Sequence, residues 1–317
     1  MKTNILVILI AIVLLAVGGI GYVLLQPADV TYERPEPSEP GSVLDEIDDT
    51  PTSTIETPEP ADDTTVPAPA TSQSTIGQSV QGTPIVAHHF GTGTTNLLFV
   101  GGLHGGYSYS TSLLAYELID YLTNNPTAVP SNLRITVVPV MNPDGLQTTV
   151  GVTGRFNAAT VRATEAQRVA GRFNANDVDL NRNFDCEWQT TGVWRTESVS
   201  GGSAPTSEPE AAALATLVRA LDPAAAIVWF GAEGRVYPSA CGGSPSRASV
   251  ELATLYGTAA DYDTAAQFDA YPVTGDFVNW LAKEGVPAIS VLLTSHTDPE
   301  WARNQRGSLA IINRFAE

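Results

Sequence analysis

Gly101-Gly102-Leu103-His104-Gly105-Gly106-Tyr107-Ser108 is the stretch that decides the fold, because it sets a histidine in a glycine-rich turn directly after an apolar run. That run, Asn96 to Val100, has the length and composition of a buried strand. Ligands of open α/β sheets bind beyond the carboxyl ends of such strands. His104 is therefore a candidate site residue, although no carboxylate accompanies it in this stretch.

Further blocks follow in a fixed order along the chain: Asn142 to Gly145, Asp179 to Phe184, Ser207 to Glu210, Ile227 to Gly231 and Ile289 to Thr294. The first has the residue preferences of a turn. The last two contain apolar, β-branched runs that suit buried central strands. Gly231 and Thr294 fall just past these runs, as His104 does, so one site could gather all three positions.

Apolar runs that predict strands alternate with periodic stretches that predict helices. Strands are predicted at 84–89, 96–100, 133–140, 225–230 and 287–293, and helices at 109–122, 206–221, 249–260, 275–283 and 299–315. This alternation predicts an α/β domain in which helices cover both faces of a mixed, mostly parallel twisted sheet.

From Thr83 to the end, the blocks and their order resemble the zinc carboxypeptidase family, more closely its bacterial branch that trims cell-wall peptides. The resemblance implies a carboxypeptidase-like fold for residues 83–317. It also implies a site in which a histidine, a nearby glutamate and a later histidine bind zinc, while another glutamate acts as general base.

Most of these catalytic positions carry other residues. His104 matches the first zinc ligand, but Ser108 or Tyr107 stands where the glutamate is expected. The resemblance implies a His-Gly-Gly-Tyr-Glu pattern and so favours Ser108, whose neutral hydroxyl is a poor zinc ligand. Gly231 replaces the second histidine and Leu292 replaces the general base. We therefore expect a catalytically degenerate domain without a cofactor, which would hold zinc only if it is active.

Other side chains would have to rescue the metal site. His88 and His89 belong to an early predicted strand, where we expect them on the sheet surface or in the core. His296 lies in a segment that looks ordinary for the family, and Glu233 follows Gly231 closely enough to reach the cavity. Two such replacements would be needed together, which disfavours a rescued site.

The substrate-binding side of the site is better preserved. Asn181 and Arg182 match the pair that grips the C-terminal carboxylate of a peptide in the family, and a guanidinium forms two parallel hydrogen bonds with a carboxylate. The alternative is a structural arginine paired with a buried acid such as Asp179. The family also uses an upstream arginine and a mobile tyrosine. Arg155 or Arg172 could be the arginine, and Tyr256 or Tyr262 the tyrosine.

Residues 1–25 predict an N-terminal transmembrane anchor, because Ile5 to Leu25 carries no charge and is long enough to cross a bilayer. Lys2 precedes this stretch, so the positive-inside rule places the rest of the chain outside the cytoplasm. The alternative is a cleaved signal peptide and a secreted protein. Residues 26–82 are rich in Pro, Thr, Ser, Asp and Glu, which predicts a disordered acidic linker.

The charge and the cysteines limit the possible partners and compartments. A net charge of −18 lacks the basic footprint of a nucleic-acid-binding protein. Two cysteines, Cys186 and Cys241, predict one disulfide in an exported chain, and two buried thiols are the alternative.

Three functional hypotheses follow from the residues and the resemblance. The first is a membrane-anchored, extracytoplasmic domain that binds the C-termini of peptides or cell-wall peptides without hydrolysing them. The second is an active metallocarboxypeptidase with an atypical metal site. The third is a non-catalytic scaffold. The presence of Asn181 and Arg182 favours the first hypothesis over the third, and the loss of several catalytic groups disfavours the second.

Overall fold

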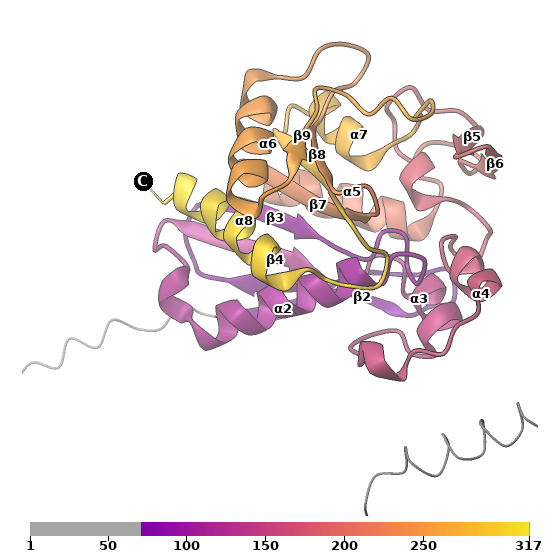
Figure 1. Ribbon diagram of the computed structural model, residues 1–317, viewed down its shortest axis with the longest axis horizontal. Coiled ribbons are helices and arrows are strands. Elements are labelled where there is room, and N and C mark those ends of the chain that lie inside the picture. Colours follow the sequence, from indigo (N-terminus) through magenta and orange to yellow (C-terminus); the bar gives the residue numbers. More distant parts are fainter. Residues whose placement is uncertain (1–70, 317) are drawn as a thin grey trace, which may run out of the picture. The chain divides into compact units, whose positions relative to one another are not determined.

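The computed structural model describes residues 71–316, and within this range eight strands form one sheet in the order β1-β2-β4-β3-β7-β10-β8-β9 (Figure 1). The four central strands β4, β3, β7 and β10 are parallel, while β1, β2 and β8 introduce antiparallel pairings and β9 runs parallel to β8. The predicted mixed, mostly parallel sheet is confirmed. The strands are β1 (Thr71–Gln78), β2 (Pro84–Phe90), β3 (Thr95–Val100), β4 (Leu133–Val138), β7 (Ala225–Gly231), β8 (Arg235–Pro238), β9 (Asp263–Thr264) and β10 (Ala288–Leu293). A separate hairpin joins β5 (Thr191–Trp194) and β6 (Glu197–Ser200).

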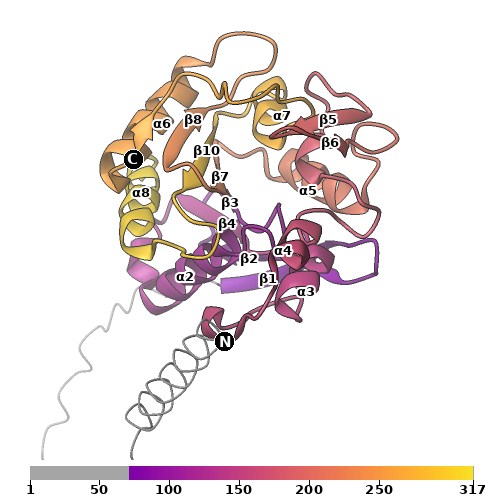
Figure 2. The ribbon, with the colours of Figure 1, turned by 45° about the vertical axis from the view of Figure 1, so that its right-hand side comes forward.

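Helices cover both faces of the sheet, as predicted (Figures 1 and 2). One face packs against α2 (Ser110–Asn124), α6 (Arg247–Ala260) and α8 (Trp301–Arg314). The other packs against α5 (Pro209–Leu221) and α7 (Phe277–Lys283). Side chains of β3 alternate between the two cores, with Leu97 and Phe99 in the first and Leu98 and Val100 in the second. A strand buried on both faces therefore reads as a continuous apolar run.

The predicted central strands and long helices are all present, with ends that differ by a few residues. The predicted turn at Asn142 is instead the start of a helix, α3 (Pro143–Val150). Asn142 caps this helix, because its side-chain oxygen accepts a hydrogen bond from the Gly145 backbone nitrogen at 2.8 Å. Proline at the first helical position has the backbone geometry that a helix start requires.

The folded domain starts earlier than the predicted boundary near Thr83. Strand β1 begins at Thr71 and pairs antiparallel with β2, so residues 71–82 do not belong to the predicted linker. Backbone hydrogen bonds to β2 hold this edge strand, and most of its side chains are exposed and polar. It therefore lacks the apolar pattern that marks an inner strand. The predicted anchor and the rest of the predicted linker lie outside the described residues. No helix within residues 71–316 has the length and apolar character needed to span a membrane.

Candidate ligand pocket

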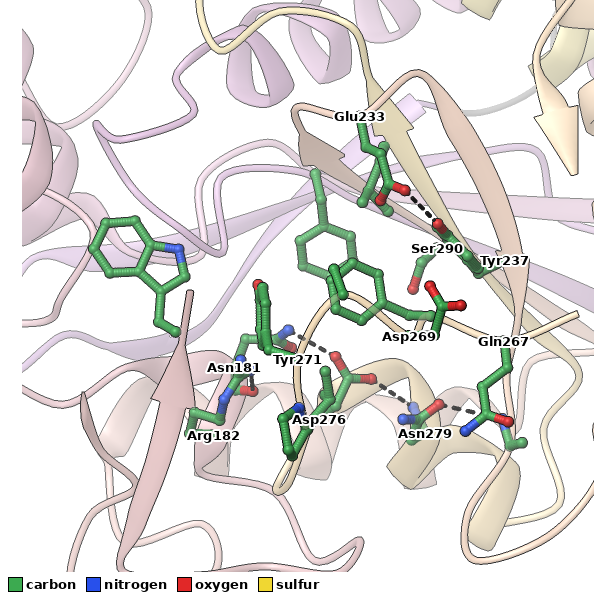
Figure 3. A pocket seen from close by; sticks show the side chains of 18 of the residues that line it. Asn181, Arg182, Glu233, Tyr237, Gln267, Asp269, Tyr271, Asp276, Asn279 and Ser290 are labelled. Atoms are coloured by element: carbon green, nitrogen blue, oxygen red, sulfur yellow. Dashed lines mark hydrogen bonds between the residues drawn. The ribbon is translucent and has the colours of Figure 1, made fainter. Parts of the chain in front are cut away.

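A pocket of about 1050 Å³ lies at the carboxyl ends of the central strands. His104 follows β3, Gly231 ends β7 and Leu292 lies near the end of β10, and all three line the pocket. Figure 3 shows Arg182 and Tyr271 on one side of this space and Glu233 and Tyr237 on the opposite side. The parallel strands thus bring together positions that are far apart in the sequence.

His104 is a buried histidine without a hydrogen-bond partner. Its side chain is 8% exposed, and neither ring nitrogen has a partner among the described residues. Nε2 lies 3.8 Å from Asp179 Oδ1, and the ring packs against Phe230 at 5.3 Å between centroids. Burial, followed by the nearby Arg172 guanidinium, holds the pKa of His104 well below its ordinary value, so the ring is neutral at pH 7.

Ser108 and His296 form a hydrogen-bonded pair beside Gly231. Ser108 Oγ lies 2.8 Å from His296 Nδ1. A Cβ at residue 231 would lie 2.9 Å from the same Nδ1 and 3.2 Å from Ser108 Oγ. His296 therefore occupies the space into which a side chain at residue 231 would project. Sequence reasoning did not place His296 at the site, because its segment carries no distinguishing pattern.

Arg172 and Asp179 form a buried ion pair at the pocket wall. Asp179 Oδ2 accepts hydrogen bonds from Arg172 Nε at 3.1 Å and from Nη2 at 2.8 Å. Burial raises the pKa of Asp179, but Arg172 and then Arg182 outweigh this effect and lower it to about 2. The Arg172 guanidinium also lies 4.5 Å from the Trp194 ring centroid. Of the two predicted upstream arginines, Arg172 is the one that lines the pocket.

Arg182 is a buried cation without a carboxylate partner among the described residues. Its Nε and Nη2 donate to the Val193 carbonyl oxygen at 3.2 and 2.8 Å, and its Nη1 donates to the Asn181 carbonyl oxygen at 2.7 Å. Asp179, the acid considered as its structural partner, is hydrogen-bonded to Arg172 instead. Backbone carbonyls therefore orient the Arg182 guanidinium at the pocket while its positive charge is left without an ion pair.

Asn181 ties the arginine-bearing segment to helix α7. Its Nδ2 donates to Asp276 Oδ2 at 2.7 Å (Figure 3). Its Oδ1 accepts from the Phe277 backbone nitrogen at 3.1 Å. Asp276 also caps α7 by accepting a hydrogen bond from the Asn279 backbone nitrogen. Both ends of the Asn181 amide are thus engaged in bonds that fix this segment, η3 (Leu180–Arg182), against the helix.

Two predicted site residues lie away from the pocket. Arg155 is half-exposed and forms two hydrogen bonds with the Asp120 carboxylate, at 2.8 and 2.6 Å. Tyr256 is fully buried in the core, where its hydroxyl accepts from Trp229 Nε1 at 3.0 Å and donates to Asn304 Oδ1 at 2.8 Å. Arg155 is thus held in a surface ion pair, and Tyr256 packs with the apolar face of helix α6. Tyr262, the other tyrosine considered, donates to Glu300 Oε2 outside the pocket.

Tyr271 and Arg195 are pocket residues that sequence reasoning missed. Tyr271 lies 5.9 Å from the Arg182 guanidinium, measured to the ring centroid, and belongs to the loop before α7. Arg195, at the turn of the β5–β6 hairpin, donates to the Tyr107 hydroxyl at 2.8 Å. Glu233, considered as a replacement metal ligand, accepts a 2.6 Å hydrogen bond from Tyr237. Pro272 and Gly275, which follow Tyr271, were the available signal for a loop at the site.

The predicted disulfide between Cys186 and Cys241 is confirmed, with 5.8 Å between the two Cα atoms. It connects the segment that follows η3 to the segment that follows β8. Glu187 and Gly242, each next to one of the cysteines, line the pocket. The bridge therefore ties together two segments that form the pocket wall.

The comparison with known families agrees with this geometry. A family model described as zinc carboxypeptidase matches residues 67–293. The chain belongs to the zinc carboxypeptidase family. The match begins before Thr71 and so includes the edge strand that extends the domain beyond its predicted start.

Relatives within the zinc carboxypeptidase family include enzymes of bacterial cell-wall peptides. The chain is 28% identical over 180 residues to gamma-D-glutamyl-L-diamino acid endopeptidase 1 of Lysinibacillus sphaericus, which covers 51% of this chain and 45% of that enzyme. It is 31% identical over 137 residues to murein peptide amidase A of Escherichia coli K12, which covers 40% of this chain and 45% of that enzyme. The chain thus matches less than half the length of these curated relatives.

Solved structures show the same fold at lower identity. The thrombin activatable fibrinolysis inhibitor aligns with a TM-score of 0.63 at 18% identity, over 79% of this chain and 70% of that one. The murein-tripeptide amidase of Escherichia coli O157 aligns with a TM-score of 0.50 at 21% identity, over 77% of this chain and 92% of that one.

The residues present do not fit the zinc site of the zinc carboxypeptidase family. His104 could serve as one zinc ligand, because its buried ring nitrogens have no hydrogen-bond partner among the described residues. Ser108 is hydrogen-bonded to His296, and Gly231 has no donor atom in a side chain. No group of three or more His, Cys, Asp or Glu side chains between residues 71 and 316 is arranged to hold a metal ion. No catalytic step through bound zinc follows from these residues, and the absence of zinc stays a prediction.

Proposed function

We propose that this chain is a membrane-anchored, extracytoplasmic carboxypeptidase-like domain that binds the C-terminal carboxylates of peptides or cell-wall peptides without hydrolysing them. The observation that carries this proposal is Arg182, a buried guanidinium that lines the pocket and has no carboxylate partner among the described residues. A buried charge without a partner is destabilising, and a ligand carboxylate would supply the partner. The fixed orientation of the Arg182 guanidinium favours a planar ligand group that accepts two hydrogen bonds, as a carboxylate does.

The surrounding residues support binding of a peptide end. Arg172 and Asn181 lie in the same pocket as Arg182, and Tyr271 lies beside its guanidinium. The volume of about 1050 Å³ is large enough for a short peptide. The two bacterial relatives, whose names describe action on murein or glutamyl-diamino acid peptides, support cell-wall peptides as the ligand class.

The side chains at the catalytic positions support the absence of hydrolysis. Leu292 lines the pocket and cannot accept a proton from water. The Ser108 hydroxyl is neutral and is engaged by His296, and Gly231 contributes no side chain. Because catalytic groups act together, the loss of several of them leaves little rate.

The proposed location rests on the sequence and on the disulfide. The uncharged stretch from Ile5 to Leu25, preceded by Lys2, supports an anchor with the pocket-bearing domain outside the cytoplasm. The Cys186–Cys241 bridge is in keeping with an oxidising compartment.

Calorimetric titration of N-acetyl dipeptides with free and amidated C-termini tests the proposal. Wild type should prefer the free acid, with micromolar to millimolar affinity. Arg182→Ala should weaken binding of the free acid by about 10- to 100-fold, which corresponds to about 1.5–3 kcal/mol for hydrogen bonds to a charged group. Arg155→Ala is the matched control, because it also removes one guanidinium, but one that lies outside the pocket in a surface ion pair with Asp120. It should leave the affinity for both ligand forms unchanged.

The comparison of free and amidated ligands on wild type does not depend on any variant folding correctly. Equal affinity for the two ligand forms, or no detectable binding of either, would reject carboxylate recognition and leave the scaffold hypothesis.

A further inference from the structure

The space beside Gly231 is filled by a histidine from a different segment. A Cβ at residue 231 would lie 2.9 Å from His296 Nδ1, closer than real Cβ atoms approach a neighbour, so His296 and a side chain at 231 exclude each other. The φ of Gly231 lies outside the left-handed region, so a positive φ does not require glycine here, and the Gly231–Ala232 peptide bond is cis. The atom nearest to the position of a Cβ at residue 231 is His296 Nδ1, followed by Ser108 Oγ and the Ser295 carbonyl oxygen at 3.2 Å each, so the packing around His296 leaves room for glycine only.

The hydrogen bond to Ser108 determines where the His296 ring carries its proton. Ser108 is buried, and its hydroxyl has no acceptor other than His296 Nδ1 among the described residues. A hydroxyl buried in this way donates to the one acceptor it has, which leaves Nδ1 unprotonated and the proton on Nε2. Burial, followed by the Arg195 guanidinium, lowers the pKa of His296 to about 4, which keeps the ring neutral at pH 7.

The His296 segment is fixed against the start of helix α2. The Ser110 backbone nitrogen donates to the His296 carbonyl oxygen at 3.2 Å, and Ser110 Oγ donates to the Ser295 carbonyl oxygen at 3.0 Å. The ring itself packs on Tyr107, with 4.4 Å between centroids. Together with the Ser108 bond, these contacts hold the ring in one orientation, as a functional side chain on a pocket wall requires.

The Nε2 atom of His296 is the part of the ring left for a ligand. The residue lines the pocket, and Nε2 has no hydrogen-bond partner among the described residues. Arg172 and Arg195 line the same pocket, so this region presents hydrogen-bond donors. A region of donors recognises oxygen acceptors, and a peptide bound by its C-terminal carboxylate carries an amide oxygen one residue before its end.

We propose that His296 contacts the bound peptide, donating its Nε2–H to a backbone carbonyl oxygen, and that Ser108 is the positioning residue that sets this tautomer. Gly231 provides the space that the arrangement needs. The inference rests on the proposed function, because it takes a peptide C-terminus as the ligand. It assigns a binding role to His296 and supporting roles to Ser108 and Gly231, two positions where the family resemblance shows only losses.

The first test uses full-length protein with ¹⁵N-labelled histidine, which has four imidazoles to assign. At pH 7, the His296 resonances should show a neutral ring protonated on Nε2, and Ser108→Ala should change the tautomer distribution. Gly231→Ala should displace the ring and shift the same resonances, because the added Cβ enters the space of Nδ1. A charged ring, or a ring protonated on Nδ1, would overturn the proposal without any ligand present.

The second test titrates N-acetyl-D-alanyl-D-alanine and its C-terminal amide. Saturating free acid should shift the His296 Nε2 resonance. His296→Ala should weaken binding of both ligand forms by about 3- to 10-fold, the value of one neutral hydrogen bond, without changing their ratio. His296→Gln should recover part of the loss through its amide donor, and His88→Gln, on strand β2, should have no effect.

The outcomes separate the inference from the proposed function. A wild type that prefers the free acid while His296→Ala binds normally and the Nε2 resonance stays in place would reject the role of His296 alone. A wild type that does not distinguish the acid from the amide, or binds neither, would reject the carboxylate site and the role of His296 with it.

Discussion

Removal of the Asp179 carboxylate should destabilise the domain strongly, because it leaves the Arg172 guanidinium buried without its counter-charge. Asp179 is fully buried and Arg172 nearly so, and two hydrogen bonds join them. Asp179→Asn keeps the size and one acceptor oxygen but removes the negative charge. The change therefore isolates the electrostatic contribution of the pair from its packing.

The expected loss in free energy of unfolding is about 3 kcal/mol. Breaking a buried ion pair from one side costs about 3–5 kcal/mol. Arg172 lines the pocket, where water can partly solvate it, and this places the loss at the lower end of that range. For a domain of this size, about 3 kcal/mol lowers the melting temperature by roughly 6–12 °C.

Thermal and urea unfolding of the full-length protein, followed by near-ultraviolet circular dichroism, measures the loss. The double variant Arg172→Met/Asp179→Asn is the control, because it removes both charges and should recover much of the stability. A loss below about 1 kcal/mol in Asp179→Asn would refute the reasoning, as would a double variant less stable than the single one.

The same pair predicts the direction of a pH effect. The folded-state pKa of Asp179, about 2, is below its ordinary value of 3.8, so its carboxylate stabilises the fold above pH 4. That contribution is lost as the pH falls from about 4 toward 2. The difference in stability between wild type and Asp179→Asn should therefore shrink over this interval, and a difference that grows on acidification would contradict the assignment.

Three further predictions concern the site and the disulfide. Elemental analysis after purification in zinc-containing buffer should find far less than one zinc per chain, because His104 supplies one ligand, and a tightly held stoichiometric zinc would contradict the ligand loss. Peptides with D-amino-acid or diaminopimelate ends should not be shortened, since Leu292 cannot act as a base, and metal-dependent release of C-terminal residues that disappears in His104→Ala would disprove this. Replacement of both Cys186 and Cys241 by serine should reduce the free energy of unfolding by about 4 kcal/mol at most, which is the chain-entropy value for a separation of 55 residues. Chemical denaturation that shows no loss would argue against a stabilising bridge.

The architecture was predictable because the central strands are buried on both faces. Ala225–Gly231 is apolar throughout, and Ala288–Leu293 is apolar except for Ser290, so this composition is visible without any alignment. The edge strand Thr71–Gln78 was missed for the opposite reason. It is exposed, polar and held by backbone bonds to β2, so no side-chain pattern distinguishes it from the linker before it.

Site residues were harder to predict because local sequence does not determine which way a side chain faces. Arg155 and Arg172 sit in identical Gly-Arg-Phe-Asn quartets, yet one pairs with Asp120 at the surface and the other with Asp179 at the pocket. The partner, which lies elsewhere in the chain, decides the role. The tyrosines were hard to assign for the same reason, because Tyr256 lies on the inner face of a helix and only the tertiary structure brings the loop of Tyr271 to Arg182.

The residues at positions 108, 231 and 296 are better explained as one coupled packing arrangement than as independent losses. Ser108, Gly231 and His296 are distant in the sequence. From the sequence alone, each residue can only be compared with the residue that the family resemblance implies at its position. In the structure the three residues are in contact. Gly231 has no side chain, His296 occupies the adjacent space, and Ser108 is hydrogen-bonded to the ring through Nδ1. A glycine without that histidine would leave a cavity beside a buried, unsatisfied hydroxyl, which is costly on both counts. This shared packing, in which His296 fills the space beside Gly231 and is held by Ser108, supports the proposal that the pocket binds a ligand.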